Sequence, residues 1–236
     1  MWARVQDQLE RYLEVEDLLA QGDAAAFRLP EGLERRVSSF EEVEETAVRL
    51  RQAWGYGLDP ITNLVEALEE RGIRIVLVEV DQKFDACQAL ANAGIPAIVV
   101  NSKHPGDRQR LSISHELGHL VLEPAGTLDR EKAASRFAGA FLVPAQVVRK
   151  ELGERRQHIS LYELHLLKHK YGISMQAWLY RAMELGILPK PAAERYFREF
   201  NHRGWRITEP GDQLAIPVSR GRVKMILLNP ALAESP

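Results

Sequence analysis

The sequence predicts an α+β fold, in which helices come before a small β-sheet and further helices follow it. Residues 73–80 (IRIVLVEV) are rich in β-branched side chains and indicate a strand. On both sides of this region, apolar residues recur at helical spacing. The chain has 236 residues, of which 45% are hydrophobic and 27% charged, which is ordinary for a globular protein.

The region before the sheet is predicted to be helical. We expect a helix over residues 2–21, followed by a loop that reaches about residue 32. The stretch Ser38-Ser39-Phe40-Glu41-Glu42 has the pattern of a capping box and predicts a helix that runs to about Trp54. Asp59 and Pro60 predict another helix start, with aspartate as the cap and proline at the first position, and an end near Gly72.

Two further strands, over residues 84–90 and 97–101, complete the predicted sheet. Helices are expected next over residues 107–122 and 131–144, separated by the turn at 124–127, and a third helix follows Pro144. Ser160 and Ser174 predict the caps of two more helices, joined at Gly172 and ending near residue 185. A helix over 192–200 and a β-hairpin over 214–228 are expected at the end.

The helix predicted over 107–122 carries a motif with a chemical meaning, His115-Glu116-Leu117-Gly118-His119. Residues four apart share a face of a helix, so both histidines can reach one metal ion from the same side. Glu116 is then placed to hold and deprotonate a water molecule, which is the H-E-x-x-H pattern of zinc peptidases. The alternative is a pair of surface histidines on an amphipathic helix. The position of Glu116, the small Gly118 and the preceding strand favour the metal site.

A catalytic zinc site takes a third protein ligand, and two glutamates compete for that role. Glu123 lies two turns, roughly 12 Å of rise, beyond His115 on the same predicted helix, so it cannot close on the ion. Glu131 opens the next helix, whose small side chains allow it to pack closely against the first. We therefore predict that His115, His119 and Glu131 bind one Zn²⁺ per chain, a set that also accepts other divalent ions. Otherwise, Glu131 is a first-turn glutamate that interacts with the helix dipole.

These two helices resemble the ImmA/IrrE family of metallopeptidases. Residues 107–114 followed by the His-Glu-Leu-Gly-His core match one block of that family. A second block is matched by Glu131, Ala134, Phe137, Ala138, Leu142 and Pro144. Weaker matches at 54–68 and 166–174 extend the resemblance over roughly residues 40–210. The chain departs from the family at Ser135, where asparagine is usual. This change affects a contact behind the metal ligands and leaves the predicted ligands themselves unchanged.

The resemblance implies a zincin-like peptidase core, with a metal-binding helix beside a small β-sheet. It also implies an intracellular zinc endopeptidase that cleaves a partner helix-turn-helix transcriptional repressor, in stress-response or mobile-element gene regulation. Members are often fused behind an N-terminal helix-turn-helix domain, which this chain is expected to lack. We accordingly divide the chain into a helical lead (residues 1–38), a metallopeptidase core (39–158) and a helical and hairpin region (159–236).

In the mechanism that these residues predict, Glu116 takes a proton from the attacking water and returns it to the leaving amine. A second group is expected to stabilise the negatively charged oxygen of the transition state. Tyr162, His165 and Tyr180 are the candidates, and the sequence does not rank them. The sequence also does not identify the substrate, the cleavage site or the oligomeric state.

Composition and charge restrict the class of protein further. The net charge of −2 and a pI near 6.4 give no basic field of the kind that nucleic-acid-binding domains show. Cys87 is the single cysteine, which excludes an internal disulfide and favours a small buried side chain. The first residues show no basic-then-apolar signal segment, and no apolar run approaches about 18 residues. A cytoplasmic protein is expected.

Two patterns in the last third suggest alternatives to a peptidase. His165 and His169 have the four-residue spacing without the glutamate, and a packed or solvent-facing pair is favoured over a second metal site. Residues 160–185 have a helix-turn-helix shape, but the second helix is mostly apolar, so packing is favoured over reading DNA. The remaining alternative is a module of the same fold that binds a transcription factor without cleaving it. The basic residues Arg206, Arg220, Arg222 and Lys224, in and before the predicted hairpin, are interpreted as a charged sheet edge rather than as the lining of a partner groove.

Overall fold

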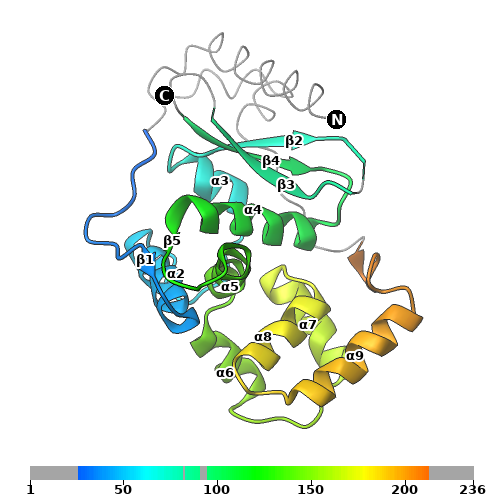
Figure 1. Ribbon diagram of the computed structural model, residues 1–236. Helices are drawn as coiled ribbons and strands as arrows, with labels where there is room; N and C mark the ends of the chain where they lie inside the picture. The colour runs from blue at the N-terminus through cyan, green and yellow to red at the C-terminus, as the bar shows by residue number, and fades with distance from the viewer. Residues whose placement is uncertain (1–25, 82, 91–94, 213–236) are drawn as a thin grey trace. The chain divides into compact units, whose positions relative to one another are not determined.

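The computed structural model describes residues 26–81, 83–90 and 95–212. The helix predicted over 2–21 and the hairpin predicted over 214–228 lie outside the described residues. The described chain mixes helices with small sheets, as Figure 1 shows, and confirms the prediction of an α+β fold. It divides into two compact units. Among the described residues, we call 62–104 the sheet unit and 30–61 with 105–212 the helical unit.

The sheet unit contains one helix and three strands. Helix α3 (Leu64–Glu69) packs against β2 (Arg74–Val78). The strand order is β2-β4-β3, where β4 (Pro96–Asn101) pairs in parallel with β2 and antiparallel with β3 (Ala86–Leu90). All six residues of β4 are buried, which fits the middle position of a strand covered on both faces. The three predicted strands are thus confirmed, with ends that differ by at most two residues.

The helix start predicted at Asp59 and Pro60 is wrong. Helix α3 begins four residues later, where the Asn63 side chain accepts a hydrogen bond from the amide of Glu66. The carbonyl groups that an earlier helix would use are already taken. The buried guanidinium of Arg51 binds the carbonyl of Asp59, and that of Arg110 binds the carbonyl of Ile61.

The helical unit begins with β1 (Arg36–Val37), which pairs with β5 (Glu123–Pro124), and α2 (Phe40–Ala53). Ser39 caps α2, and Glu42 accepts a hydrogen bond from the amide of Ser38, so the predicted capping box is present with its return bond one residue earlier. The other helices are α4 (Gly106–Val121), α5 (Arg130–Leu142), α6 (Ala145–Leu152), α7 (Leu161–Tyr171), α8 (Met175–Glu184) and α9 (Lys190–His202).

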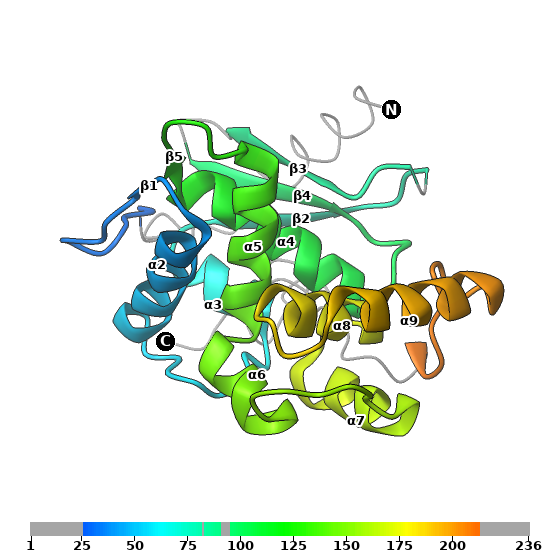
Figure 2. The same cartoon turned by 60° about the horizontal axis from the view of Figure 1, so that its bottom comes forward.

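Helix α5 is the centre of the helical unit and packs against α4 on one side and α2 on the other, as Figure 2 shows. Eight of its thirteen residues are buried, and they include Phe137 and Phe141, whose rings stack 5.6 Å apart. Small side chains of α5 let the neighbouring helices approach. These are Ala133, Ala134, Ala138, Gly139 and Ala140.

A buried arginine joins α8 to α2 and α5. The guanidinium of Arg181 donates two hydrogen bonds to the carboxylate of Glu44, at 2.5 and 3.0 Å, and one to the carbonyl of Val143 at 3.2 Å. Glu44 also pairs with Arg136 of α5. A β-carbon on Gly139 would lie 2.6 Å from Cδ of Arg181, so this glycine gives the arginine its path through the core.

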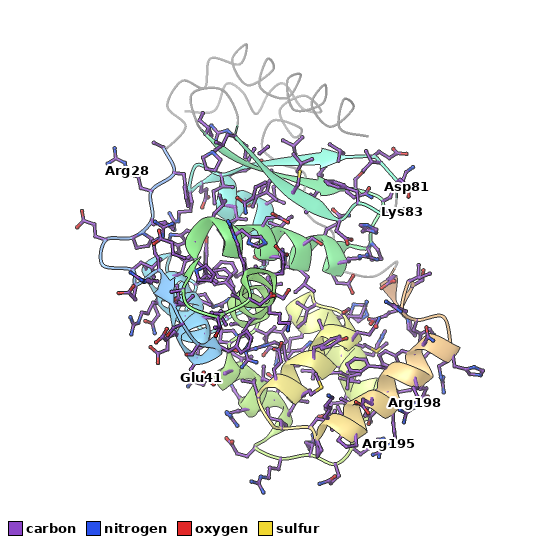
Figure 3. All side chains as sticks on the ribbon, in the orientation of Figure 1. Arg28, Glu41, Asp81, Lys83, Arg195 and Arg198 are labelled. Carbon is purple, nitrogen blue, oxygen red and sulfur yellow. The ribbon has the colours of Figure 1, made fainter. Side chains whose placement is uncertain are left out.

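The last three helices agree with the sequence prediction. Ser160 and Ser174 cap α7 and α8 through their side chains, and Gly172 ends α7 in the left-handed conformation with φ of 67°. Helix α9 is amphipathic, since Tyr196 and Phe200 are buried while Arg195 and Arg198 point outward (Figure 3). Among the described residues, no helix is both long enough and apolar enough to span a bilayer. The three-part division at residues 38 and 158 stays a prediction.

Candidate metal centre

The side chains of His115, His119 and Glu131 meet on one face of the helical unit. Nε2 of His115 lies 3.1 Å from Nε2 of His119. The two oxygens of Glu131 each face one of the histidines, at 3.2 Å from Nε2 of His115 and 3.2 Å from Nε2 of His119. The three residues form a group of potential metal ligands. The structure therefore brings together the three side chains that the sequence analysis selected.

The close packing of α4 and α5 produces this meeting. A β-carbon on Gly118 would lie 3.1 Å from Cα of Ala134 and 3.2 Å from its carbonyl oxygen, so the two backbones approach where α4 has no side chain. Asp129 caps α5 by accepting a hydrogen bond from the amide of Lys132. The cap starts the helix so that Glu131 falls in its first turn, facing the histidines.

The group is open on the side of the glutamate. The side chain of His119 is 10% exposed and that of His115 is 23% exposed, whereas that of Glu131 is 73% exposed. Glu116 follows His115 on α4 and is half-buried. Glu123, the glutamate rejected as a ligand, lies beyond the end of α4 in β5 and forms an ion pair with Arg35.

Burial lowers the pKa of His119, the charge of His115 lowers it further, and Glu131 opposes both. The net effect favours the neutral imidazole, which is the form that binds a metal.

The donor set and its spacing fit a zinc ion. Tetrahedral zinc with bonds of about 2.0–2.1 Å requires ligand atoms about 3.3 Å apart. The two imidazole nitrogens lie 3.1 Å apart, and each lies 3.2 Å from a different oxygen of Glu131. Two imidazole nitrogens and a carboxylate oxygen are also the donors that zinc prefers, and three protein ligands leave one position open.

Comparison with known proteins gives the family. The family model described as the IrrE N-terminal-like domain, Peptidase_M78, matches residues 68–183. The chain carries an IrrE N-terminal-like domain. This domain includes α4, α5 and all three members of the candidate metal group, and it confirms the predicted resemblance to the ImmA/IrrE family.

The comparisons with individual proteins show less similarity than the family model. No curated protein matches the chain. One solved structure that matches is a Mycobacterium tuberculosis transcriptional regulator, with 15% sequence identity and a TM-score of 0.46. The match covers 73% of this chain and 51% of the regulator, so this chain spans about half the length of that protein.

Within the IrrE N-terminal-like domain, Ser135 stands behind the metal group. Its hydroxyl oxygen lies 3.3 Å from Nδ1 of His115, the ring nitrogen that does not face Glu131. Ser135 is one turn beyond Glu131 on α5, so a single helix supplies both contacts. The sequence singled out Ser135 only as a departure from the family, and the structure shows that serine still reaches the histidine.

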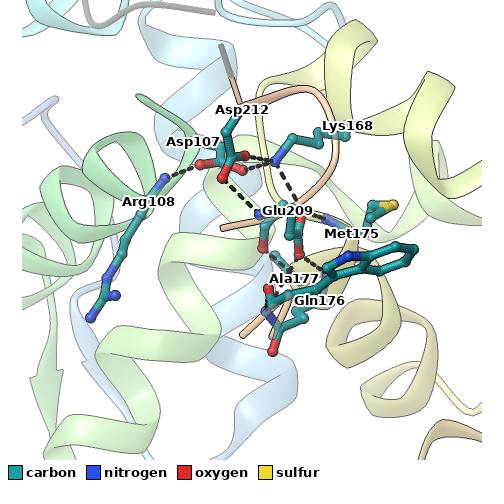
Figure 4. Close-up of polar contacts among 10 residues, drawn as sticks. Asp107, Arg108, Lys168, Met175, Gln176, Ala177, Glu209 and Asp212 are labelled. Atoms are coloured by element: carbon teal, nitrogen blue, oxygen red, sulfur yellow. Dashed lines mark hydrogen bonds and ion pairs between the residues drawn. The ribbon is translucent and has the colours of Figure 1, made fainter. Parts of the chain in front are cut away.

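A second group of acidic side chains, near the start of α4, surrounds a lysine. Asp107, Glu209 and Asp212 also form a group of potential metal ligands, but Nζ of Lys168 contacts all three carboxylates, at 2.5, 2.9 and 2.6 Å (Figure 4). Burial alone lowers the pKa of Lys168, yet the charges of Glu209 and Asp107 outweigh burial and raise it above its ordinary value. The ammonium group therefore already occupies the centre of these acids, where a metal ion would bind. Sequence analysis missed this cluster, although a lysine in the apolar stretch of α7 was a signal for a buried partner.

The remaining sequence candidates lie on α7 and α8. The ring of His165 contacts that of His169 with centroids 4.5 Å apart, and both rings lie against Gly211. Tyr162 is exposed on α7. Tyr180 of α8 lines a hollow together with Leu111, which is one turn before His115 on α4. The choice among the three candidate oxyanion donors stays open.

Proposed function

We propose that this protein is a zinc-dependent endopeptidase in which His115, His119 and Glu131 hold the metal and Glu116 is the general acid–base. The observation that carries the proposal is the meeting of two imidazole nitrogens and one carboxylate at 3.1–3.2 Å on an H-E-x-x-H helix. Membership of the M78 peptidase family supports the same chemistry.

The protein residues divide the work of hydrolysis between them. When bound, zinc supplies a positive charge that polarises a peptide carbonyl and makes water easier to deprotonate. Glu116 takes the proton of the attacking water and delivers it to the leaving amine. Ser135 holds His115 in the tautomer that presents Nε2 to the metal group. The open side of the group, at Glu131, admits the polypeptide.

We further propose that the substrate is a helix-turn-helix transcriptional repressor, which the resemblance to the ImmA/IrrE family supports. A direct role in reading DNA through α7 and α8 has less support. The arginine of α8, Arg181, is buried in its ion pair with Glu44 and cannot reach a phosphate or a base edge.

The decisive experiment compares wild-type protein with Glu116→Gln, both loaded with zinc, on a mixture of random peptides. Mass spectrometry of newly formed termini should show cleavage by the wild type and none by the variant, while both hold about one zinc per chain. Equal cleavage by the two proteins would remove Glu116 from the mechanism. Zinc binding without any cleavage would favour a module that binds a transcription factor without cutting it.

The proposed substrate needs its own test. Co-expression with candidate helix-turn-helix repressors, followed by gel analysis, should yield a shortened repressor with the wild type and an intact one with Glu116→Gln. If the protein cuts peptides but leaves every repressor intact, the proposed substrate class is contradicted and the peptidase activity is not.

A further inference from the structure

A hollow of about 270 Å³ lies in the helical unit, and its lining begins one turn of α4 before His115. Arg108 and Leu111 of α4 line it on one side and Ala177 and Tyr180 of α8 on another. The segment after α9 adds Trp205, Arg206 and Ile207. Its volume is just below the roughly 300–1,000 Å³ of small-molecule sites, so it suits one or two side chains rather than a cofactor.

The hollow continues the face of α4 that carries the histidines. Arg108, Leu111 and His115 are spaced by three and four residues and therefore share one face of the helix. Leu111 is one turn, about 6 Å of rise, from His115. An extended peptide rises about 3.3 Å per residue, so a peptide cut beside His115 reaches the hollow with a side chain about two residues from the cleaved bond.

Hydrogen bonds hold two walls of the hollow in place. Glu209 accepts hydrogen bonds from the amides of Met175 and Gln176, at 2.8 and 3.0 Å, and so fixes the first turn of α8. The side-chain amide of Gln176 donates to the carbonyl of Trp205 at 3.1 Å. Lys168 ties Glu209 to Asp107 at the start of α4 (Figure 4). The hollow is thus formed without a ligand, which lowers the entropy cost of filling it.

The chemistry of the walls favours a bulky uncharged side chain. Tyr180 and Ile207 leave 51% and 67% of their surface exposed, and few large apolar residues of the described chain are as open. The carboxylates that border the hollow, Asp107, Glu209 and Asp212, each contact the ammonium group of Lys168. The guanidinium of Arg108 points away from that cluster (Figure 4).

A second hollow, of about 300 Å³, adjoins the metal group through Glu131 and Ser135. Its other walls include Arg136 and Glu184, which pair with each other and are charged. Tyr180 of the first hollow and Glu184 of the second are one turn apart on α8. His115 therefore lies between two hollows, both with mostly apolar walls, and the first continues the face of α4 that carries the histidines.

We propose that the hollow lined by Leu111, Ala177, Tyr180, Trp205 and Ile207 is the specificity subsite of the peptidase. It accepts an aromatic or large aliphatic side chain of the substrate, about two residues from the bond that is cut. This inference rests on the proposed function, because the substrate peptide must lie across the metal group.

Binding tests the subsite without the need for cleavage. Zinc-loaded Glu116→Gln protein is immobilised and used to select from a random peptide mixture, whose bound members are sequenced. The same selection is run in this background with Ala177→Phe, which fills the hollow, and with Ile207→Ser, which removes part of its wall. Ala145→Phe on α6 and Leu166→Ser on α7 make the same changes outside both hollows and serve as matched controls.

Enrichment of aromatic or large aliphatic residues should appear with the parent and both controls. It should fall about tenfold with Ala177→Phe and several-fold with Ile207→Ser, because apolar burial is lost. Enrichment that is absent from the parent, or unchanged by Ala177→Phe, overturns the subsite. If the wild type cuts no peptide but the Glu116→Gln protein still selects aromatic or large aliphatic residues, the apolar site stands. The proposed peptidase function is then overturned.

Discussion

The hydroxyl oxygen of Ser135 lies 3.3 Å from Nδ1 of His115, whose Nε2 faces Glu131 on the other edge of the ring. The two nitrogens of one imidazole thus have separate partners, both supplied by α5. When Nε2 binds a metal, Nδ1 carries the proton and donates it to the serine oxygen.

Ser135→Ala should weaken zinc binding about 10- to 100-fold, because His115 loses the partner that fixes its tautomer. Competition with a coloured chelator measures the affinity without any substrate. Ser135→Asn should restore binding, since the amide oxygen also accepts the Nδ1 hydrogen. Ser114→Ala changes the serine next to His115, whose buried hydroxyl does not take part in the metal group, and should leave the affinity unchanged. An unaltered affinity in Ser135→Ala would rule out the positioning role.

Glu131→Ala should reduce the zinc content well below one ion per chain after dialysis, because two histidines alone hold the ion weakly. Elemental mass spectrometry of the purified protein measures this directly. Glu123→Ala is the matched control, since Glu123 is an exposed glutamate paired with Arg35. Equal zinc in wild type and Glu131→Ala would show that the third ligand lies elsewhere.

Gly118→Ala should disturb both the fold and the metal group. Alanine gains about 1 kcal/mol of helix propensity over glycine, but its β-carbon would press on Ala134 at 3.1 Å, and overpacking costs about 1–3 kcal/mol. We expect a net loss of about 1 kcal/mol in the free energy of unfolding, together with weaker zinc binding as Glu131 moves away. Urea denaturation and chelator competition measure the two effects. A variant that is more stable and binds zinc normally would refute the role of this close approach.

Lys168→Met should lower the free energy of unfolding by about 3–5 kcal/mol, because the buried Asp107 and Glu209 and the partly buried Asp212 lose the cation that all three contact. Lys170→Met, which removes a largely exposed pair with Glu151, should cost no more than about 1 kcal/mol. Similar losses in the two variants, measured by urea denaturation, would show that the buried cluster is not stabilising.

The pKa of Lys168 also predicts a pH dependence. A lysine pKa that is raised on folding stabilises the protein fully below the ordinary value, and this stabilisation is lost as the pH rises through the raised value. The difference in unfolding free energy between wild type and Lys168→Met should therefore be constant from about pH 7 to about pH 9. A difference that shrinks within that range would mean that Lys168 loses its proton early.

Local patterns in the sequence predicted much of the fold. The serines at 39, 160 and 174 cap helices as expected, because a cap depends on residues three positions apart. The meeting of His115, His119 and Glu131 followed from helical periodicity and a short turn. Asp59 misled the prediction, because Arg51 takes its carbonyl and the true cap, Asn63, lies four residues on.

Long-range polar contacts could not be predicted in the same way. Lys168 and Asp107 are 61 positions apart, and no periodicity relates them. The strand order β2-β4-β3 depends likewise on which edges pair, which the apolar runs alone do not encode. The apolar hollow combines side chains from α4, α8 and the segment after α9, so it appears only once these segments are folded together.

The ion pair between Glu44 and Arg181 bears on how this protein can be shortened. A fragment cut to the matched residues 68–183 would retain every member of the metal group, yet it would discard α2. Arg181 and Arg136 would then face the interior without the carboxylate of Glu44, and leaving a buried charge unpaired costs several kcal/mol. The stretch that sequence similarity outlines is thus smaller than the unit that can fold, and a workable N-terminal boundary for expression lies before Ser38.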